Sequence, residues 1–174
     1  ATGADFSCTS LGNDPVGLAS PVTMRGVTAA YLFANTLVVL EVTEEVLRQT
    51  LERCAAYFTL VDGQPQISEE FLLPKVEHYN YDFYAGLSYT FDLRRPVGSR
   101  VIHLTKLDGS PLGSGKFRLC TSNYRATGTG GYEILRKCPV LWRGGTEMPD
   151  LTARYIQAHS PMPQLHNVEM RVIW

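Results

Sequence analysis

The pattern of apolar and polar residues divides the chain into segments of strand length and helix length. Residues 36–42 form a nearly continuous apolar run that is rich in β-branched side chains, which is typical of a buried strand. In residues 87–93, Leu, Tyr and Phe alternate with Ser, Thr and Asp, and this predicts a strand with one buried face. Further strands are expected at residues 4–9, 100–107, 116–121 and 168–174.

Helical spacing is clearest in the segment that follows Thr43. Thr43 is a suitable N-cap, and Glu44 and Glu45 complement the positive end of a helix. Residues that can face a core then recur at intervals of three and four: Val46, Leu47, Thr50, Leu51, Cys54 and Phe58. We therefore expect an amphipathic helix over residues 44–58. Shorter helices are expected at 24–30, after Thr23, and at 150–159, before Pro161 and Pro163.

Glycine, proline and polar residues mark the predicted loops. Residues 11–21 and 61–66 are expected to be loops, the second around Asp62-Gly63. Asp108-Gly109 predicts a hairpin turn that joins the strands at 100–107 and 116–121.

The order of these elements predicts the fold class. Strands linked by hairpins dominate the middle of the chain, which favours an α+β fold over a doubly wound sheet. We expect one domain over residues 1–174, with a mixed, mostly antiparallel sheet and with the helices at 44–58 and 150–159 packed on it.

Composition narrows the possible partners. The 174 residues include 44% hydrophobic and 19% charged residues, an ordinary balance for a globular protein. Sixteen basic residues face 17 acidic ones, so there is no basic excess to hold a nucleic-acid polymer. No apolar run approaches the ~20 residues that a membrane-spanning helix needs, so no membrane span is expected.

The four cysteines give no metal-binding spacing. Cys8, Cys54 and Cys120 lie among apolar neighbours and are interpreted as small core residues, and Cys138 is the fourth. One disulfide remains an alternative, so the cysteine count does not decide the redox compartment.

A glycine-rich segment follows the strand expected at 116–121. Residues 123–132 read Asn-Tyr-Arg-Ala-Thr-Gly-Thr-Gly-Gly-Tyr. Three glycines in four residues let a ligand approach the main chain closely, and Tyr124 is placed where a ring could be offered to a planar group. A nucleobase stacked on an aromatic ring gains ~1–3 kcal/mol. The alternative is a purely structural turn.

A second aromatic cluster precedes the strand at 87–93. Residues 78–84 contain five rings in seven positions, and consecutive aromatic residues cannot all face one core. Some of these rings are expected to line a cleft or to form a surface cluster.

Five stretches of the chain together resemble a known family. They are Thr2-Gly3-Ala4-Asp5, residues 31–39 (YLFANTLVV), Tyr79-Asn80-Tyr81-Asp82 with Gly86-Leu87-Ser88-Tyr89, Asn123-Tyr124-Arg125-Ala126, and Tyr155-Ile156-Gln157 with Trp174. In this order they resemble the C-terminal domain of the secreted 5′-nucleotidase family. The likeness is closest to the bacterial 2′,3′-cyclic-nucleotide 2′-phosphodiesterase/3′-nucleotidase branch.

The resemblance implies how a nucleoside or nucleotide would be bound. In the family, this domain holds the base between two aromatic rings. One ring would be that of Tyr124, and the other that of Tyr79, with Tyr81 as the alternative. Asn123, Arg125 and the backbone of residues 128–131, including Gly128, Gly130 and Gly131, would line the same cleft.

Two departures from the family pattern separate the chain from simple 5′-nucleotidases. Many members carry an acidic residue in the glycine loop for the ribose hydroxyls, and Gly130 stands at that position here. They also carry an early Gly-Gly-Ile-Arg element that contacts phosphate, where this chain has Ser10-Leu11-Gly12-Asn13-Asp14. Both departures agree better with the cyclic-nucleotide branch.

The resemblance places the chemistry outside this chain. Family members hydrolyse phosphoesters with two divalent metal ions in an N-terminal metallophosphatase domain. Its metal-binding motifs do not occur in this sequence, and His78, His103, His159 and His166 are scattered without ligand spacing. We therefore expect no catalytic residue, metal ligand or cofactor in this chain. The metallophosphatase domain is its expected partner, in a secreted, cell-wall-associated or periplasmic protein.

Two other functions compete with this interpretation. The exposed tyrosines could serve a non-catalytic cell-surface module that binds a protein or a glycan. The chain could also be an autonomous enzyme, although no nucleophile motif such as Gly-x-Ser-x-Gly occurs in it.

Overall fold

The computed structural model describes residues 2–31, 33–162 and 169–174. The strands are β1 (Phe6–Ser10), β2 (Thr36–Val42), β3 (Phe58–Val61), β4 (Gln64–Ile67), β5 (Asp82–Ala85), β6 (Leu87–Asp92), β7 (Val101–Lys106), β8 (Phe117–Ser122), β9 (Val140–Glu147) and β10 (Glu169–Ile173). The helices are α1 (Met24–Ala30), α2 (Glu44–Ala55), α3 (Asn123–Ala126), α4 (Glu133–Arg136) and α5 (Met148–Ala158), with short 3-10 turns η1 (Glu69–Phe71) and η2 (His78–Asn80).

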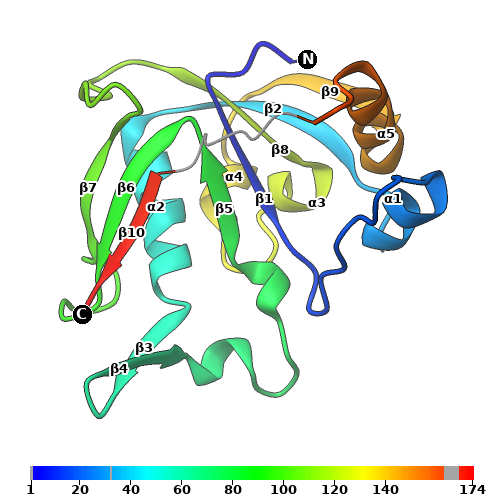
Figure 1. Ribbon diagram of the computed structural model, residues 1–174. Helices are drawn as coiled ribbons and strands as arrows, with labels where there is room; N and C mark the ends of the chain where they lie inside the picture. The colour runs from blue at the N-terminus through cyan, green and yellow to red at the C-terminus, as the bar shows by residue number, and fades with distance from the viewer. Residues whose placement is uncertain (1, 32, 163–168) are drawn as a thin grey trace.

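Two sheets and a small hairpin make up the strand layers (Figure 1). The larger sheet has the order β5-β1-β8-β2-β9 and the smaller has the order β10-β6-β7, while β3 pairs with β4. Only the pairs β1–β8 and β6–β10 are parallel among these described strands. The α+β class and the mixed, mostly antiparallel sheet are therefore confirmed.

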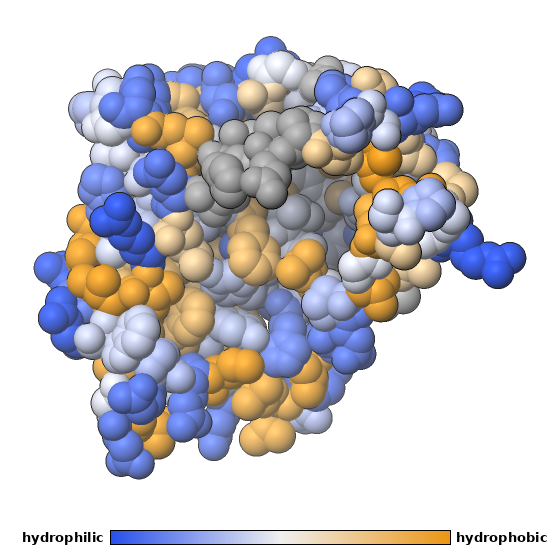
Figure 2. All heavy atoms as spheres, viewed as in Figure 1, coloured by the Kyte–Doolittle hydropathy of each residue, from blue (hydrophilic) through white to orange (hydrophobic). Residues whose placement is uncertain are grey.

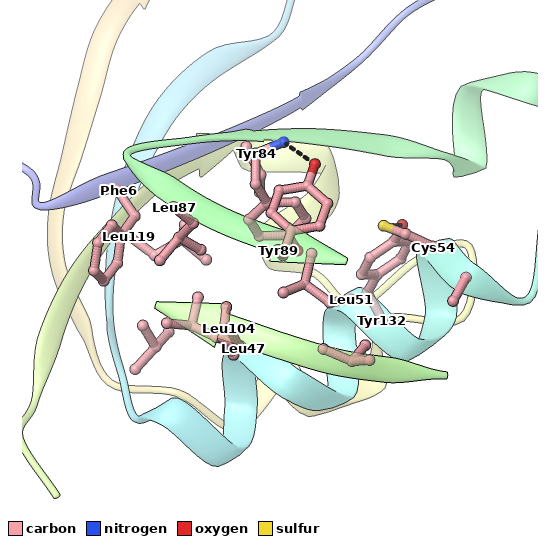
Figure 3. Close-up of a cluster of buried hydrophobic side chains, with 14 of the residues drawn as sticks. Phe6, Leu47, Leu51, Cys54, Tyr84, Leu87, Tyr89, Leu104, Leu119 and Tyr132 are labelled. Carbon is pink, nitrogen blue, oxygen red and sulfur yellow. Dashed lines mark hydrogen bonds between the residues drawn. The ribbon is translucent and has the colours of Figure 1, made fainter. Parts of the chain in front are cut away.

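The main core lies between α2 and the strands (Figure 3). Leu47 and Leu51 of α2 point toward Tyr89 of β6 and Leu104 of β7. Removing such apolar side chains from water is the dominant favourable term in folding. On the face shown in Figure 2, the remaining hydrophobic residues form several separate patches.

Gly86 makes the sharp change of direction between the two sheets possible. It separates β5 of the larger sheet from β6 of the smaller one, and its φ is +90°. A Cβ atom at this position would lie 2.9 Å from the carbonyl oxygen of Asp5. Both the backbone angle and the close approach therefore require glycine.

The helix expected at 44–58 ends earlier, at Ala55. The buried guanidinium of Arg100 donates hydrogen bonds to the carbonyl oxygens of Ala55 (2.9 Å) and Phe58 (2.6 Å). These bonds satisfy a carbonyl at the helix end and direct the chain into β3. The turn at Asp62-Gly63 then joins β3 to β4, and both residues have positive φ, as a tight hairpin requires.

The prediction of a hairpin at Asp108-Gly109 is wrong. The chain does turn there, with the N–H of Gly109 bonded to the carbonyl of Lys106 (3.0 Å). However, β7 and β8 then enter different sheets and do not pair with each other. Turn chemistry predicts the change of direction but not the partner of the next strand.

Other boundaries shift by a few residues. The helix expected at 150–159 begins at Met148, with Pro149 in its first turn, and ends at Ala158. The final strand begins at Glu169, and Val168 and Pro163 lie outside the described residues. The sequence pattern missed β3, β4, β5 and β9, and β4 occupies part of the loop expected at 61–66. Residues 123–126, expected to be loop, form a helical turn.

All four cysteines are free, so the disulfide alternative is not observed. Cys8, Cys54 and Cys120 are buried, as expected for core residues, and Cys138 is half-buried. Burial raises the pKa of Cys54 to about 12 and also raises that of Cys8.

This burial predicts selective thiol labelling, because only the thiolate reacts. In the folded protein at pH 8, a thiol-reactive reagent such as DTNB should modify Cys138 first. Cys8, Cys54 and Cys120 should react only after unfolding in denaturant. Mass spectrometry of the labelled peptides distinguishes the sites, and rapid labelling of Cys54 in the folded protein would contradict the packing described above.

Candidate functional site

The segments that carry the predicted site residues meet at one end of the larger sheet, where its strands begin or finish (Figure 1). The parallel strands β1 and β8 both finish at this end, and the antiparallel strands β2 and β5 both begin there. Loop residues 11–15 follow β1, α3 and the glycine loop follow β8, residues 33–35 precede β2, and η2 precedes β5. Strand direction alone therefore brings four distant parts of the sequence together.

Asn123 and Tyr124 lie in the first turn of α3. The hydroxyl of Ser122 caps this turn by accepting a hydrogen bond from the N–H of Arg125 (3.1 Å). The side-chain oxygen of Asn123 accepts a hydrogen bond from the N–H of Thr36 (3.1 Å), which ties α3 to the start of β2. Tyr124 as a whole residue is 36% exposed.

Unlike Tyr124, Arg125 is buried and is only 2% exposed. Its guanidinium makes a bidentate ion pair with Asp82 of β5, with both N–O distances 2.8 Å. It also donates to the carbonyl oxygens of Thr129 (2.6 Å) and Tyr79 (2.9 Å). One side chain therefore joins α3, the glycine loop, η2 and β5.

The surroundings of this ion pair are aromatic and apolar. The Arg125 guanidinium lies 4.0 Å from the centre of the buried Tyr132 ring, a favourable cation–π arrangement. Burial raises the pKa of the Asp82 carboxyl, and the Arg125 guanidinium opposes this shift by stabilising the charged form. The charge on Asp82 therefore depends on Arg125.

The glycine loop is held from inside by a second arginine. Arg53 of α2 donates from Nε to the carbonyl oxygen of Gly130 (2.9 Å) and pairs with Glu70 (2.6 Å). Gly128, Gly130 and Gly131 all have positive φ. These contacts fix the loop conformation.

Gly130 has no space for a side chain. A Cβ atom there would overlap the side-chain amide of Asn80 and approach the Arg125 guanidinium. At Gly131, a Cβ atom would overlap the side chain of Arg53. The packing therefore leaves no room at position 130 for the acidic residue that the family resemblance would place there.

Tyr79 and Tyr81 have different surroundings. Tyr79 is half-buried, donates its hydroxyl proton to Glu77 (3.1 Å), and is linked through its carbonyl to Arg125. Tyr81 is buried among Tyr57, Phe58 and Phe83, with ring centres 5.0–5.7 Å away. The structure thus links the backbone of Tyr79 to the guanidinium of Arg125, and it places the ring of Tyr81 in a separate aromatic cluster.

Phe33 is an exposed aromatic residue at the same end of the sheet that the sequence pattern did not indicate as a site residue. The residue is 69% exposed, and its carbonyl accepts a hydrogen bond from the N–H of Asn35 (2.8 Å). Thr36, which follows Asn35, donates its backbone N–H to the side chain of Asn123. A large aromatic side chain in a short connection before a buried strand was the available signal.

The remaining candidate positions have local partners. The Asn13 amide of the loop after β1 donates to the carbonyl of Val76 (2.8 Å). His103 is exposed on β7, and His78 bonds the hydroxyl of Tyr57 (2.8 Å). His166 lies outside the described residues.

The described part of the chain offers neither a metal-binding cluster nor a membrane-spanning helix. No group of three or more His, Cys, Asp or Glu side chains there is arranged to hold a metal ion. None of the helices in residues 2–31, 33–162 and 169–174 is long and apolar enough to cross a membrane.

Comparison with known proteins gives consistent matches. Residues 1–137 match the family model described as 5′-nucleotidase, C-terminal domain. The chain is 30% identical over 183 aligned residues to the 2′,3′-cyclic-nucleotide 2′-phosphodiesterase/3′-nucleotidase of Haemophilus influenzae. This alignment covers 92% of this chain and 27% of that protein.

Solved structures show the same fold. A protein of Staphylococcus aureus described as a 5′-nucleotidase, in complex with α-ketoglutarate, superposes with a TM-score of 0.93 at 34% identity, over 98% of this chain and 34% of that chain. A 5′-nucleotidase precursor of Thermus thermophilus superposes with a TM-score of 0.74 at 22% identity, over 98% and 32%. The chain thus spans about a third or less of these longer relatives.

The ion pair predicts a strong coupling between two substitutions. Asp82→Asn removes the charge that compensates Arg125 and should destabilise the fold by about 3–5 kcal/mol. Arg125→Met should also destabilise it, and the double variant should lose less than the sum of the two. Urea unfolding of all four proteins measures this coupling. Additivity within about 0.5 kcal/mol would show that the pair is not a unit.

The packing of the glycine loop predicts a difference between two glycine substitutions. Gly130→Ala should be more destabilising than Gly63→Ala. Both positions have positive φ, which strains alanine by ~1–2 kcal/mol, but only position 130 lacks space for the methyl group. Equal losses in urea unfolding would contradict the overlap with Asn80.

Proposed function

Because the chain belongs to the 5′-nucleotidase C-terminal domain family, we propose that it is the substrate-binding domain of a nucleotide phosphoesterase. In this proposal it holds the base of a nucleoside or nucleotide by stacking on Tyr124. The observation that carries the proposal is a partly exposed ring on a backbone that is fixed on both sides. Asn123 ties this turn to β2, and the neighbouring Arg125 ties it to β5 and the glycine loop.

A rigid platform favours stacking because little conformational entropy is lost on binding. A base stacked on one ring gains ~1–3 kcal/mol, and the interaction is tolerant of the identity of the base. The proposal therefore predicts weak binding of several nucleosides by the isolated chain.

Two aromatic residues compete for the second side of the base. Tyr79 is linked to Arg125 through its carbonyl, and Phe33 is more exposed and lies in the segment that Asn123 anchors. Tyr81 is disfavoured in this role because its ring already packs against Tyr57, Phe58 and Phe83.

Arg125 is proposed to act on the base indirectly. Four hydrogen bonds occupy its guanidinium, and Asp82 balances its charge. It therefore shapes the Tyr124 platform and the glycine loop, and phosphate binding is assigned to groups outside this chain.

The remainder of the proposal concerns the longer parent protein. Since the matched relatives are longer, we propose an N-terminal metallophosphatase domain with two divalent metal ions, which would receive the phosphate while this domain holds the base. We propose a secreted, cell-wall-associated or periplasmic location, in line with the Thermus relative's description as a precursor. The isolated chain should show only background hydrolysis of a chromogenic phosphate ester with added Mn²⁺ or Zn²⁺.

Binding of adenosine tests the proposal. NMR titration of the isolated chain should show binding at millimolar concentration, with shifts at residues 123–131. Tyr124→Ala should weaken it by about 5- to 150-fold, the loss of one stacked ring. Comparing Tyr79→Ala with Phe33→Ala identifies the second ring.

Trp174→Ala is the matched control, because Trp174 is also an exposed aromatic residue but follows β10 of the other sheet. It should leave adenosine binding unchanged. No adenosine binding at millimolar concentration, or an equal loss in the control, would count against the proposal. Binding of a glycan or protein that adenosine does not displace would favour an interaction module.

A further inference from the structure

A partly exposed carboxylate lies beside the proposed nucleoside platform. Glu77 is the residue before η2, and 28% of its side-chain surface is exposed. Two residues of η2 donate hydrogen bonds to it, the Tyr79 hydroxyl to Oε1 (3.1 Å) and the Asn80 amide to Oε2 (2.8 Å). The ammonium group of Lys75 lies 3.2 Å from Oε1. These donors hold the carboxylate in one orientation.

Arg125 connects this carboxylate to the ring of Tyr124. The Arg125 guanidinium lies 5.6 Å from the centre of that ring, and it also donates to the carbonyl oxygen of Tyr79 (2.9 Å). The pKa of the Tyr124 hydroxyl is raised, mainly by burial, and the charge of Glu77 raises it further while that of Lys75 opposes the shift. The carboxylate and the ammonium group therefore border the ring on which a base would stack.

Glu77 retains the capacity for one more hydrogen bond. An ionised carboxylate offers about four acceptor positions, and Lys75, Tyr79 and Asn80 use three of them. The hydrogen bond from Lys75 above all lowers the pKa of this carboxyl, so that it is charged at neutral pH. The Lys75 side chain is itself 69% exposed, and its ammonium group has donors left for a ligand.

This pair of charged groups matches a hydroxyl group on the ligand. A hydroxyl can donate to the Glu77 carboxylate and accept from the Lys75 ammonium group at the same time. An exocyclic amino group of a base acts as a donor only, and a phosphate oxygen would face the carboxylate without a proton to share. Sugar hydroxyls are common to ribonucleosides of every base, so this contact preserves the tolerance for the base that stacking gives.

We propose that Glu77 is a specificity-determining residue of the nucleoside site, whose carboxylate accepts a hydrogen bond from a free hydroxyl of the sugar. This proposal rests on the function proposed above, because it needs the base on Tyr124. The sugar then lies against residues 75–77. The site therefore distinguishes nucleosides by the sugar more than by the base.

Analogues of adenosine that lack sugar hydroxyls test this contact. In an NMR titration of the full chain, either 2′,3′-dideoxyadenosine or 5′-deoxyadenosine should bind about 3- to 10-fold more weakly than adenosine, the usual effect of losing one hydrogen bond. The weaker analogue identifies which side of the sugar faces Glu77. Purine riboside, which lacks the amino group of the base, should bind within about twofold of adenosine, because its stacking is retained.

A substitution links this preference to the carboxylate. Glu77→Gln keeps the size of the side chain, but it removes the charge and one acceptor oxygen, and the remaining oxygen is needed by Tyr79 and Lys75. This variant should bind adenosine and the weaker analogue within about twofold of each other. Glu69→Gln is the matched control, because Glu69 is an exposed glutamate of the neighbouring turn η1 and its loss should leave the preference intact. The amide spectrum of each variant without ligand establishes that it is folded.

The outcomes separate this proposal from the one on which it rests. Equal binding of adenosine and both deoxy analogues would overturn the role of Glu77 and leave base stacking in place. A loss confined to purine riboside, or a preference for adenosine that survives in Glu77→Gln, would also overturn it. If none of these nucleosides binds at millimolar concentration, both proposals fail.

Discussion

The ion pair between Arg125 and Asp82 is the interaction on which the candidate site depends. It lies at the point where the larger sheet meets η2 and the glycine loop, and it is almost completely removed from water. A charge in such a place is tolerated only when its partners are complete. The position of Tyr124, the residue before Arg125, therefore follows from bonds that Arg125 makes on the inside of the fold.

The two arginines of the site, Arg125 and Arg53, bind different carbonyl groups of the glycine loop. Arg125 holds the carbonyl of Thr129, and Arg53 holds that of Gly130, so successive peptide groups of the loop are fixed from two directions. The glycines are required because the loop has positive φ angles and because the arginines and Asn80 occupy the space beside it. Glycine-rich loops are often associated with mobility, but here the glycines permit close packing.

Much of the fold could be predicted from the sequence, because local patterns encode it. The buried strand at 36–42, the alternating strand at 87–93 and the capped helix after Thr43 were all found in place. Strand pairing could not be predicted, since Asp108-Gly109 specifies a turn but not that β8 joins β1 and β2. For the site, the sequence selected Tyr124 and the glycine loop. It could not separate Tyr79 from Tyr81, because their exposure depends on distant residues such as Tyr57.

The contact between Asn80 and the backbone of Gly130 has a consequence for how the family diversifies. Since the two positions share one small volume, they cannot be varied independently. A lineage that gains an acidic side chain in the glycine loop must first shorten or redirect the residue at position 80, or the intermediate will fold poorly. These two positions, 50 residues apart, should therefore change together among homologues, and the order of the two changes is constrained by sterics.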